Sequence, residues 1–231
     1  MSVHGKKYRA AADKLDRKTE HELDAALTFL KENPVAKFDE TAEIAFRLGV
    51  DPTKSDQSVR GTVSLPHGTG KTVRVVVFAS GPAADAAREA GAVEVGFEDL
   101  VAKVQGGWTD FDVAIATPEA MKEVRKLGKV LGPRGLMPNP RTGTVTEDTA
   151  AAVKQFQAGR VEFKMDRHGN VMLPFGKLSF PVEALVENAR AVIQALKSAR
   201  PSVVKGTFIK RCTVTSTMGP GLMIASREIT M

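Results

Sequence analysis

The outer parts of the chain, residues 1–66 and 160–231, alternate apolar and polar residues over short stretches. Within 38–50 the apolar side chains recur at every second position. They are Ala42, Ile44, Phe46 and Leu48. Because side chains alternate between the two faces of a strand, this pattern predicts a half-buried strand. Further strands are expected at 58–65, 160–165, 171–175, 206–215 and 222–226.

Two of these strands, 160–165 and 171–175, are separated by a short segment that contains Gly169, and they are expected to pair as a hairpin. Three helices complete the outer parts. They are a charged helix at 5–18 and amphipathic helices at 22–31 and 181–197. The last has Pro181 at its start and one continuous apolar stripe along its length, which is typical of a helix packed on a sheet.

Between residues 67 and 159 the pattern changes. The run 73–78, VRVVVF, is nearly all apolar, which is typical of a strand covered on both faces. Shorter strands are expected at 93–95 and 112–116. Helices are expected at 82–90, 97–104 and 147–157, and one more opens at 117–119. Strands that alternate with short helices indicate βαβ units and a parallel sheet.

These two patterns predict two domains. A split α+β domain comprises residues 1–66 and 160–231, and an α/β domain of residues 67–159 is inserted into it. The two connections fall at glycines, Gly68 and Gly70 on one side and Gly159 on the other. Paired connections of this kind permit the domains to move relative to one another.

Composition excludes several classes of protein. The chain contains no apolar run of the roughly 18 residues that a membrane span needs, so no membrane partner is expected. Its basic N-terminal stretch lacks the apolar core of a secretory signal. The single cysteine, Cys212, excludes an internal disulfide framework and is expected to be a small buried hydrophobic residue. Together these features favour a cytoplasmic protein.

The distribution of charge points to a polyanionic partner. The net charge is +6, and residues 160–231 hold the whole excess, with 11 basic and 5 acidic residues. No acidic residue lies between Glu187 and Glu228. An unbalanced basic region of this kind is expected of a protein that binds nucleic acid.

No catalytic or metal site emerges from the motifs. The stretch 67–72, HGTGKT, resembles the end of a phosphate-binding loop, but the required first glycine is replaced by Leu65 and the stretch leads into a strand rather than a helix. The four histidines are scattered, without the spacing of a zinc site. The neighbouring acids Asp39 and Glu40, like Asp110 and Asp112, are expected to be turn or surface residues. We therefore expect no enzyme activity, no metal and no cofactor.

The stretch 213–221, TVTSTMGPG, is the candidate working surface. Its threonines at alternate positions point away from the core side of the expected strand, and Gly219 and Gly221 leave bare backbone in the turn that follows. A row of hydroxyls can meet a polar partner closely. The alternative interpretation is a solvated edge strand with a turn, because threonine is also a good strand former.

Two further segments carry open alternatives. Phe38, beside Lys37, is either a core residue or an exposed ring that packs on a nucleotide. The loop 132–143 is rich in proline and glycine and carries Arg134 and Arg141, so it either contacts phosphates or caps the sheet.

Four stretches together resemble the family of the bacterial large-subunit ribosomal protein one, the protein of the mobile ribosomal side stalk. They are AKFDET (36–41) with SDQSVRGTVSLPHGTGK (55–71), LGPRGLMPNPRTGTV (131–145), GRVEFKMDRHGNV (159–171) and TSTMGPG (215–221). The resemblance implies a split α+β domain with an inserted Rossmann-like three-layer α/β domain. It also implies a non-enzymatic structural protein of the large ribosomal subunit that is a monomer off the ribosome.

The resemblance further implies the partners. The chain would bind a stem-loop region of large-subunit ribosomal RNA, assist release of exit-site tRNA, and repress translation of its own operon by binding a similar structure in its mRNA. Folded RNA presents 2′-hydroxyls and base edges on a shallow minor groove, which small hydroxyl side chains can reach. Two other readings stay open: a nucleotide-dependent enzyme that uses the inserted domain, and a DNA-binding repressor.

Carried over by motif, the principal RNA contact is Thr217, Met218 and Gly219, with Lys37 and Phe38 beside it. Strand position and charge add four more candidates. They are Thr41, Lys164, Lys177 and Thr215. At Met172 the chain departs from the polar residue expected of the family, so contacts from residues 166–172 are left open.

Overall fold

A computed structural model describes residues 5–16 and 19–230 and divides the chain into two compact units. The first unit comprises Met1–Gly70 and Val161–Met231, and the second comprises Lys71–Arg160. Each contains its own hydrophobic core, with no core residue shared between them. The chain is thus a mixed α/β protein with antiparallel and parallel sheets, as the two sequence patterns predict.

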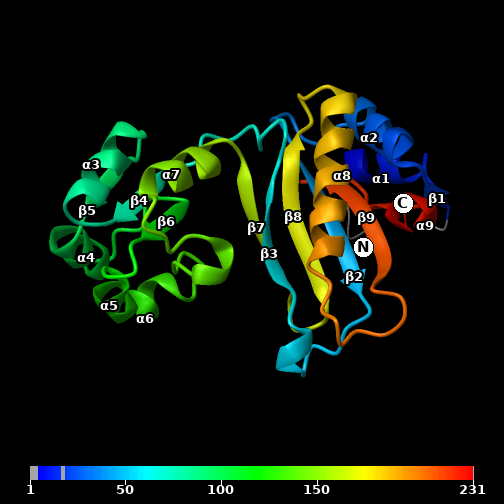
Figure 1. Ribbon diagram of the computed structural model, residues 1–231. Helices are drawn as coiled ribbons and strands as arrows, with labels where there is room; N and C mark the ends of the chain where they lie inside the picture. The colour runs from blue at the N-terminus through cyan, green and yellow to red at the C-terminus, as the bar shows by residue number, and fades with distance from the viewer. Residues whose placement is uncertain (1–4, 17–18, 231) are drawn as a thin grey trace. The chain divides into compact units, whose positions relative to one another are not determined.

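The first unit is built around a five-stranded sheet in the order β1-β10-β9-β2-β8 (Figure 1). Its strands are β1 (Glu20–His21), β2 (Thr41–Leu48), β8 (Asn170–Lys177), β9 (Ile209–Ser216) and β10 (Leu222–Ile224). Its helices are α1 (Lys6–Ala12), α2 (Leu23–Glu32), the 3₁₀ turn η1 (Ser55–Gln57), α8 (Val182–Ser198) and α9 (Ser226–Thr230). Strand β9 pairs with β10 on one side and with β2 on the other, both antiparallel, so β9 is an interior strand.

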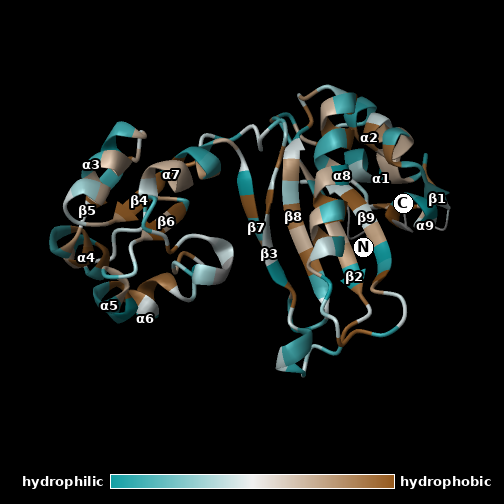
Figure 2. Cartoon of the chain, in the orientation of Figure 1, coloured by the Kyte–Doolittle hydropathy of each residue, from teal (hydrophilic) through white to brown (hydrophobic). Residues whose placement is uncertain are grey.

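One face of this sheet is covered by α2 and α8, which contact each other as well as β9 and β8 (Figure 1). The predicted apolar face of β2 lies in this core, since Ala42, Ile44, Phe46 and Leu48 are all buried. Cys212 and Val214 of β9 face the same core and are fully buried. Along the strands the colour alternates between apolar and polar residues (Figure 2). The polar side chains that alternate with these buried residues therefore lie on the opposite face of the sheet, away from α2 and α8.

The predicted hairpin of 160–165 with 171–175 is wrong. Strand β7 (Arg160–Lys164) pairs with β3 (Arg60–Ser64) in a separate two-stranded sheet, whereas β8 pairs with β2. The turn itself exists, and the carboxylate of Asp166 accepts hydrogen bonds from the N–H groups of His168 and Asn170, both at 2.8 Å. The strands diverge beyond it because the ring of Phe163 packs directly on Gly61 of β3, where a Cβ would lie 2.8 Å from the ring.

The second unit contains a three-stranded parallel sheet in the order β5-β4-β6. Its strands are β4 (Val75–Phe78), β5 (Glu94–Gly96) and β6 (Val113–Ala116). Its helices are α3 (Pro82–Glu89), α4 (Glu98–Gln105), α5 (Met121–Val124), η2 (Arg125–Leu127), α6 (Gly128–Leu131), η3 (Pro140–Thr142) and α7 (Thr149–Gln157).

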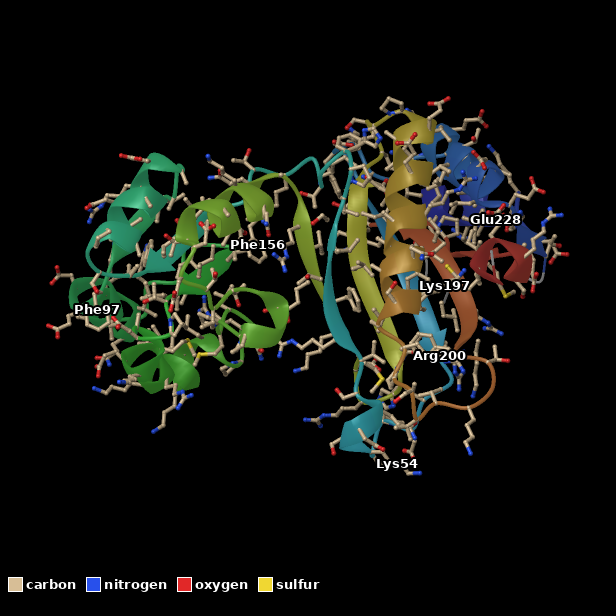
Figure 3. All side chains as sticks on the ribbon, viewed as in Figure 1. Lys54, Phe97, Phe156, Lys197, Arg200 and Glu228 are labelled. Carbon is tan, nitrogen blue, oxygen red and sulfur yellow. The ribbon has the colours of Figure 1, made fainter. Side chains whose placement is uncertain are left out.

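Both faces of the parallel sheet are covered. Val76 and Phe78 pack with α4, α5 and α6, while Val75 and Val77 pack with α3 and α7. Phe156, labelled on α7 in Figure 3, belongs to this second core. This is the arrangement that the uninterrupted apolar run predicts. The helix expected to open at residues 117–119 begins slightly later, at Met121.

Candidate nucleic-acid interface

The threonines of β9 lie on the sheet face away from the helices. Thr213 and Thr215 are half-buried and Thr217 is exposed, while the intervening Cys212, Val214 and Ser216 are buried. The predicted orientation of this hydroxyl row is therefore confirmed. The alternative of a solvated edge strand is wrong, because β9 has β10 on one side and β2 on the other.

At one end of this face, three strands bring candidate residues into contact. The hydroxyl of Thr217 accepts a hydrogen bond from the backbone N–H of Thr41 at 2.9 Å. The ammonium of Lys177 donates to the hydroxyl of Thr41 at 2.8 Å. Two residues before Thr217, Thr215 of β9 lies opposite Glu43 of β2 in the sheet register and donates its hydroxyl to the carbonyl of Gly219.

The segment before β2 joins this group through Glu40. One carboxylate oxygen of Glu40, Oε1, accepts hydrogen bonds from the N–H groups of Val35 at 2.9 Å and Ala36 at 2.6 Å. The other, Oε2, accepts from the hydroxyl of Ser216 at 2.6 Å and the N–H of Met218 at 3.1 Å. The loop that carries Lys37 and Phe38 is thereby held beside the turn after β9.

We call the resulting group the Thr217 cluster. It consists of Lys37, Phe38, Thr41, Lys177, Thr215, Thr217, Met218 and Gly219. Eight of the nine residues predicted as contacts thus gather at one end of the open sheet face. The ninth, Lys164, is the exposed last residue of β7 and belongs to the separate two-stranded sheet with β3.

Two side chains of the Thr217 cluster present apolar surface to solvent. Phe38 is 58% exposed and Met218 is 53% exposed. Phe38 is therefore not a core residue, and its ring is free to pack against a flat partner. Met172, at the position where the sequence departs from the family pattern, is 62% exposed and lies on β8 opposite Ala45 of β2.

Glu40 corrects the prediction of a turn or surface acid. It is only 1% exposed, and no cation pairs with it within the described residues. Burial alone would raise the pKa of this carboxyl. The hydrogen bonds from Ser216 and from the N–H groups of Ala36, Met218 and Val35 outweigh burial, so the pKa of Glu40 lies below its ordinary value. Sequence reasoning missed this residue.

The absence of a side chain at Gly219 also matters inside the protein. A Cβ at this position would lie 2.3 Å from the hydroxyl oxygen of Ser216 and 3.4 Å from the Leu30 side chain. The missing side chain therefore points into the protein and leaves room for the Ser216–Glu40 hydrogen bond.

The loop 132–143 belongs to the second unit and is hydrogen-bonded largely within that unit. Its arginine Arg134 donates to the hydroxyl of Thr109, and the buried Thr142 donates to the carbonyl of Asn139 at 3.0 Å. The side chain of Arg141 lies outside the described residues. These contacts hold the loop within the second unit and define no partner.

The other motifs of the sequence form no such site in the described residues. Residues 66–72 form turns that lead into β4, so the HGTGKT stretch does not open a helix. Within residues 5–16 and 19–230, no group of three or more His, Cys, Asp or Glu residues could hold a metal ion. Over the same residues, every helix is too short or too polar to cross a bilayer.

Comparison with known families identifies the chain. The sequence model of the family described as ribosomal protein L1p/L10e matches residues 30–220 of this chain. This range contains β2, β9 and the whole Thr217 cluster. The chain is therefore a ribosomal protein, a class of structural and non-enzymatic proteins. Within that class it belongs to the L1p/L10e family. The resemblance drawn from the four sequence stretches, and the expectation that the chain is not an enzyme, are both confirmed.

Curated relatives agree along nearly the whole chain. It is 54% identical to the large ribosomal subunit protein uL1 of Bifidobacterium longum strain DJO10A, over 97% of both chains. It is 55% identical to the large ribosomal subunit protein uL1 of Cutibacterium acnes, over 95% of this chain and 94% of that protein.

Proposed function

We propose that the chain is a structural component of the large ribosomal subunit and that its first unit binds large-subunit ribosomal RNA through the Thr217 cluster. The observation that carries this proposal is the gathering of Lys37, Phe38, Thr217 and Met218 at one end of an open sheet face. These residues combine a positive charge, a flat ring, a hydroxyl and a thioether on one small exposed surface.

The chemistry of the surface suits folded RNA. An exposed aromatic ring can stack on an unpaired base, and small hydroxyls can reach 2′-hydroxyls and base edges. Lys177 and Lys37 add attraction to phosphates, which would make binding depend on salt. The hydroxyls and the ring would then supply selectivity, since phosphate contacts alone carry no sequence information.

The far end of the same sheet face supports a polyanionic partner. Arg47 of β2 lies directly opposite Arg211 of β9 in the register, and both side chains are exposed. Like charges in directly opposed positions destabilise a sheet. Away from this face, Lys197 near the end of α8 and Arg200 just beyond it, both labelled in Figure 3, also fall within the stretch that contains no acidic residue. RNA phosphates would neutralise such an excess.

Three finer roles belong to the same proposal. The chain would form the mobile side stalk of the subunit, assist release of exit-site tRNA, and repress its own operon by binding an mRNA stem-loop that imitates the ribosomal site. Off the ribosome it would be a monomer. Because one surface would serve both RNAs, the mRNA stem-loop and the ribosomal RNA fragment should compete for it.

Crosslinking of the full chain to ribosomal RNA, followed by mapping of the attached peptides, tests the proposal. We expect crosslinked peptides from residues 36–41 and 215–219. Filter binding should show that the mRNA stem-loop displaces the ribosomal fragment and that duplex DNA of equal length does not. Crosslinks confined to residues 71–160, or equal competition by duplex DNA, would refute the assignment of the site to the first unit or to RNA.

A further inference from the structure

The unusual feature of the Thr217 cluster is the buried carboxylate beneath it. Moving a charged group out of water is costly unless hydrogen bonds or a counter-charge replace the lost hydration. Glu40 has no cation partner within the described residues, and its two oxygens accept four hydrogen bonds instead. Such an arrangement holds only while all the donors stay in place.

The donors come from two separate segments. Oxygen Oε1 binds the N–H groups of residues 35 and 36, and Oε2 binds the hydroxyl of Ser216 and the N–H of Met218. The two segments are far apart in sequence, and the partners of Oε2 lie 176 and 178 residues from Glu40. A single carboxylate therefore fixes the spacing between the loop with Lys37 and Phe38 and the turn with Thr217 and Met218.

The same bonds limit what this surface can offer a partner. The N–H of Met218 donates to Glu40, the N–H of Thr217 donates to the carbonyl of Thr41, and the N–H of Gly219 donates to the carbonyl of Ser216. The backbone donors of the turn are thus used within the protein. What remains for a partner is the set of outward side chains, whose value depends on how accurately they are spaced.

We propose that Glu40 is a positioning residue for RNA recognition: it does not touch RNA, and it sets the distance between the Phe38 loop and the Thr217 turn before RNA arrives. This inference rests on the proposed function. A surface whose side chains are already spaced for the partner loses less conformational freedom on binding, so its complex dissociates more slowly.

The substitution Glu40→Gln tests the inference because it keeps the shape and removes the charge. The NH₂ group of the glutamine replaces one of the two carboxylate oxygens and cannot accept a hydrogen bond. Either the N–H groups of residues 35 and 36 or the N–H of Met218 therefore lose their acceptor. We expect the affinity for a ribosomal RNA fragment to fall about tenfold or more, given the strength of hydrogen bonds to charged groups. Electrostatics alone predicts the opposite sign, since the variant is one charge more positive and RNA is an anion.

Glu187→Gln is the matched control. Glu187 is an exposed acid in the N-terminal part of α8, in the same unit, and it pairs with His67. Its replacement by glutamine makes the same change in net charge. Its affinity for RNA should be unchanged or slightly higher. A loss of affinity in Glu40→Gln with none in Glu187→Gln separates positioning from charge.

A purely structural role would lower the fraction of active protein without changing how the active molecules bind. We therefore expect Glu40→Gln to keep a normal active fraction in stoichiometric titration, to associate at the wild-type rate and to dissociate faster. The slope of log affinity against log salt should also stay unchanged, because no phosphate contact is lost. A folded variant with wild-type dissociation refutes the inference.

If Glu40→Gln does not fold, Ser216→Ala keeps the question open to test, because it removes one donor of the four. It should raise the dissociation rate about threefold or more, and unchanged dissociation refutes the inference. Failure of the proposed function gives a different result. In that case the wild-type chain itself would not bind the ribosomal fragment, whereas failure of the inference alone leaves wild-type binding intact.

Discussion

The substitution Gly219→Ala perturbs the packing under the Thr217 cluster at one atom. The new methyl group would lie 2.3 Å from the hydroxyl oxygen of Ser216, far inside van der Waals contact. Gly219 is not one of the described glycines that have a positive φ, so its backbone conformation is also open to alanine. The whole cost should therefore come from the clash with Ser216.

The magnitude follows from how that clash can be relieved. Rotation of the Ser216 side chain removes the clash and breaks its 2.6 Å hydrogen bond to Glu40. A hydrogen bond to a charged group contributes about 1.5–3 kcal/mol. Displacement of the backbone instead would cost about 1–3 kcal/mol, as overpacking generally does. Both routes predict a loss of about 2 kcal/mol, or a fall of roughly 4–8 °C in the unfolding temperature.

A double-mutant cycle isolates this term. In Ser216→Ala the hydroxyl is absent, and the new methyl of Gly219→Ala would meet the Leu30 side chain at 3.4 Å and the Cβ of residue 216 at 3.5 Å, both ordinary contacts. There the substitution should be neutral or slightly stabilising, since alanine restricts the unfolded chain more than glycine does. The expected coupling between positions 216 and 219 is about 2 kcal/mol.

Urea unfolding followed by circular dichroism measures the cycle. The single tryptophan, Trp108, packs against the core of the second unit, so its fluorescence transition should not move and serves as an internal control. An equal cost of Gly219→Ala in both backgrounds would refute the packing argument. So would a loss of RNA affinity at unchanged stability, because the glycine would then be required by the partner.

Three further predictions concern single groups. Thr217→Val removes an outward hydroxyl at nearly constant volume and leaves any RNA group bonded to it unpaired, so RNA binding should weaken by about 1–3 kcal/mol. Thr28→Val removes an exposed hydroxyl on α2 and should leave RNA binding unchanged, and equal filter-binding affinities of the two variants would contradict this. Because the folded-state pKa of Glu40 lies below its ordinary value, the stabilisation that its charge contributes is present above that ordinary value and is lost as the pH falls through the lowered pKa. The difference in unfolding free energy between wild type and Glu40→Gln should therefore shrink in acid, and a constant difference in urea titrations would count against it. Burial raises the pKa of the Cys212 thiol to about 12, so a disulfide reagent at neutral pH should modify the denatured chain quickly and the native chain only slowly; rapid native labelling would show that the site opens.

Side-chain periodicity predicted the strands that carry the site, because burial on one face fixes the period. The alternation of Ile44 and Phe46 on β2, and of Cys212 and Val214 on β9, followed directly from which residues avoid water. The uninterrupted run of β4 was equally informative, since alternate residues enter two different cores. The outward direction of the threonines then required no further information.

Strand pairing was less predictable than strand position. The 166–170 segment has the chemistry of a turn, and Asp166 does close it, yet a turn specifies only that the chain reverses. Which strand lies alongside depends on packing between distant residues. The close contact of Phe163 with Gly61 draws β7 to β3, and no local pattern around either residue reveals it.

The buried role of Glu40 had no local signature for a related reason. A carboxylate that is neutralised by a cation can be anticipated from charge pairing, but one that is satisfied by backbone N–H groups and a hydroxyl cannot. Its donors depend on the path of residues 35–36 and 216–218, which only the folded chain defines. In the sequence, Glu40 resembles a second surface acid beside Asp39, which is exposed and accepts a hydrogen bond from the hydroxyl of Ser179.

The residues around the turn after β9 therefore divide into two layers with different measurable consequences. Thr217 and Met218 face outward, so substitutions there should change RNA affinity with little change in stability. Ser216, Gly219 and Glu40 face inward, so substitutions there should lower stability and affinity together, because the outer layer is only as well placed as the inner layer allows. The ratio of the two losses for each variant then assigns a residue to contact or to support, which the sequence TSTMG alone does not distinguish.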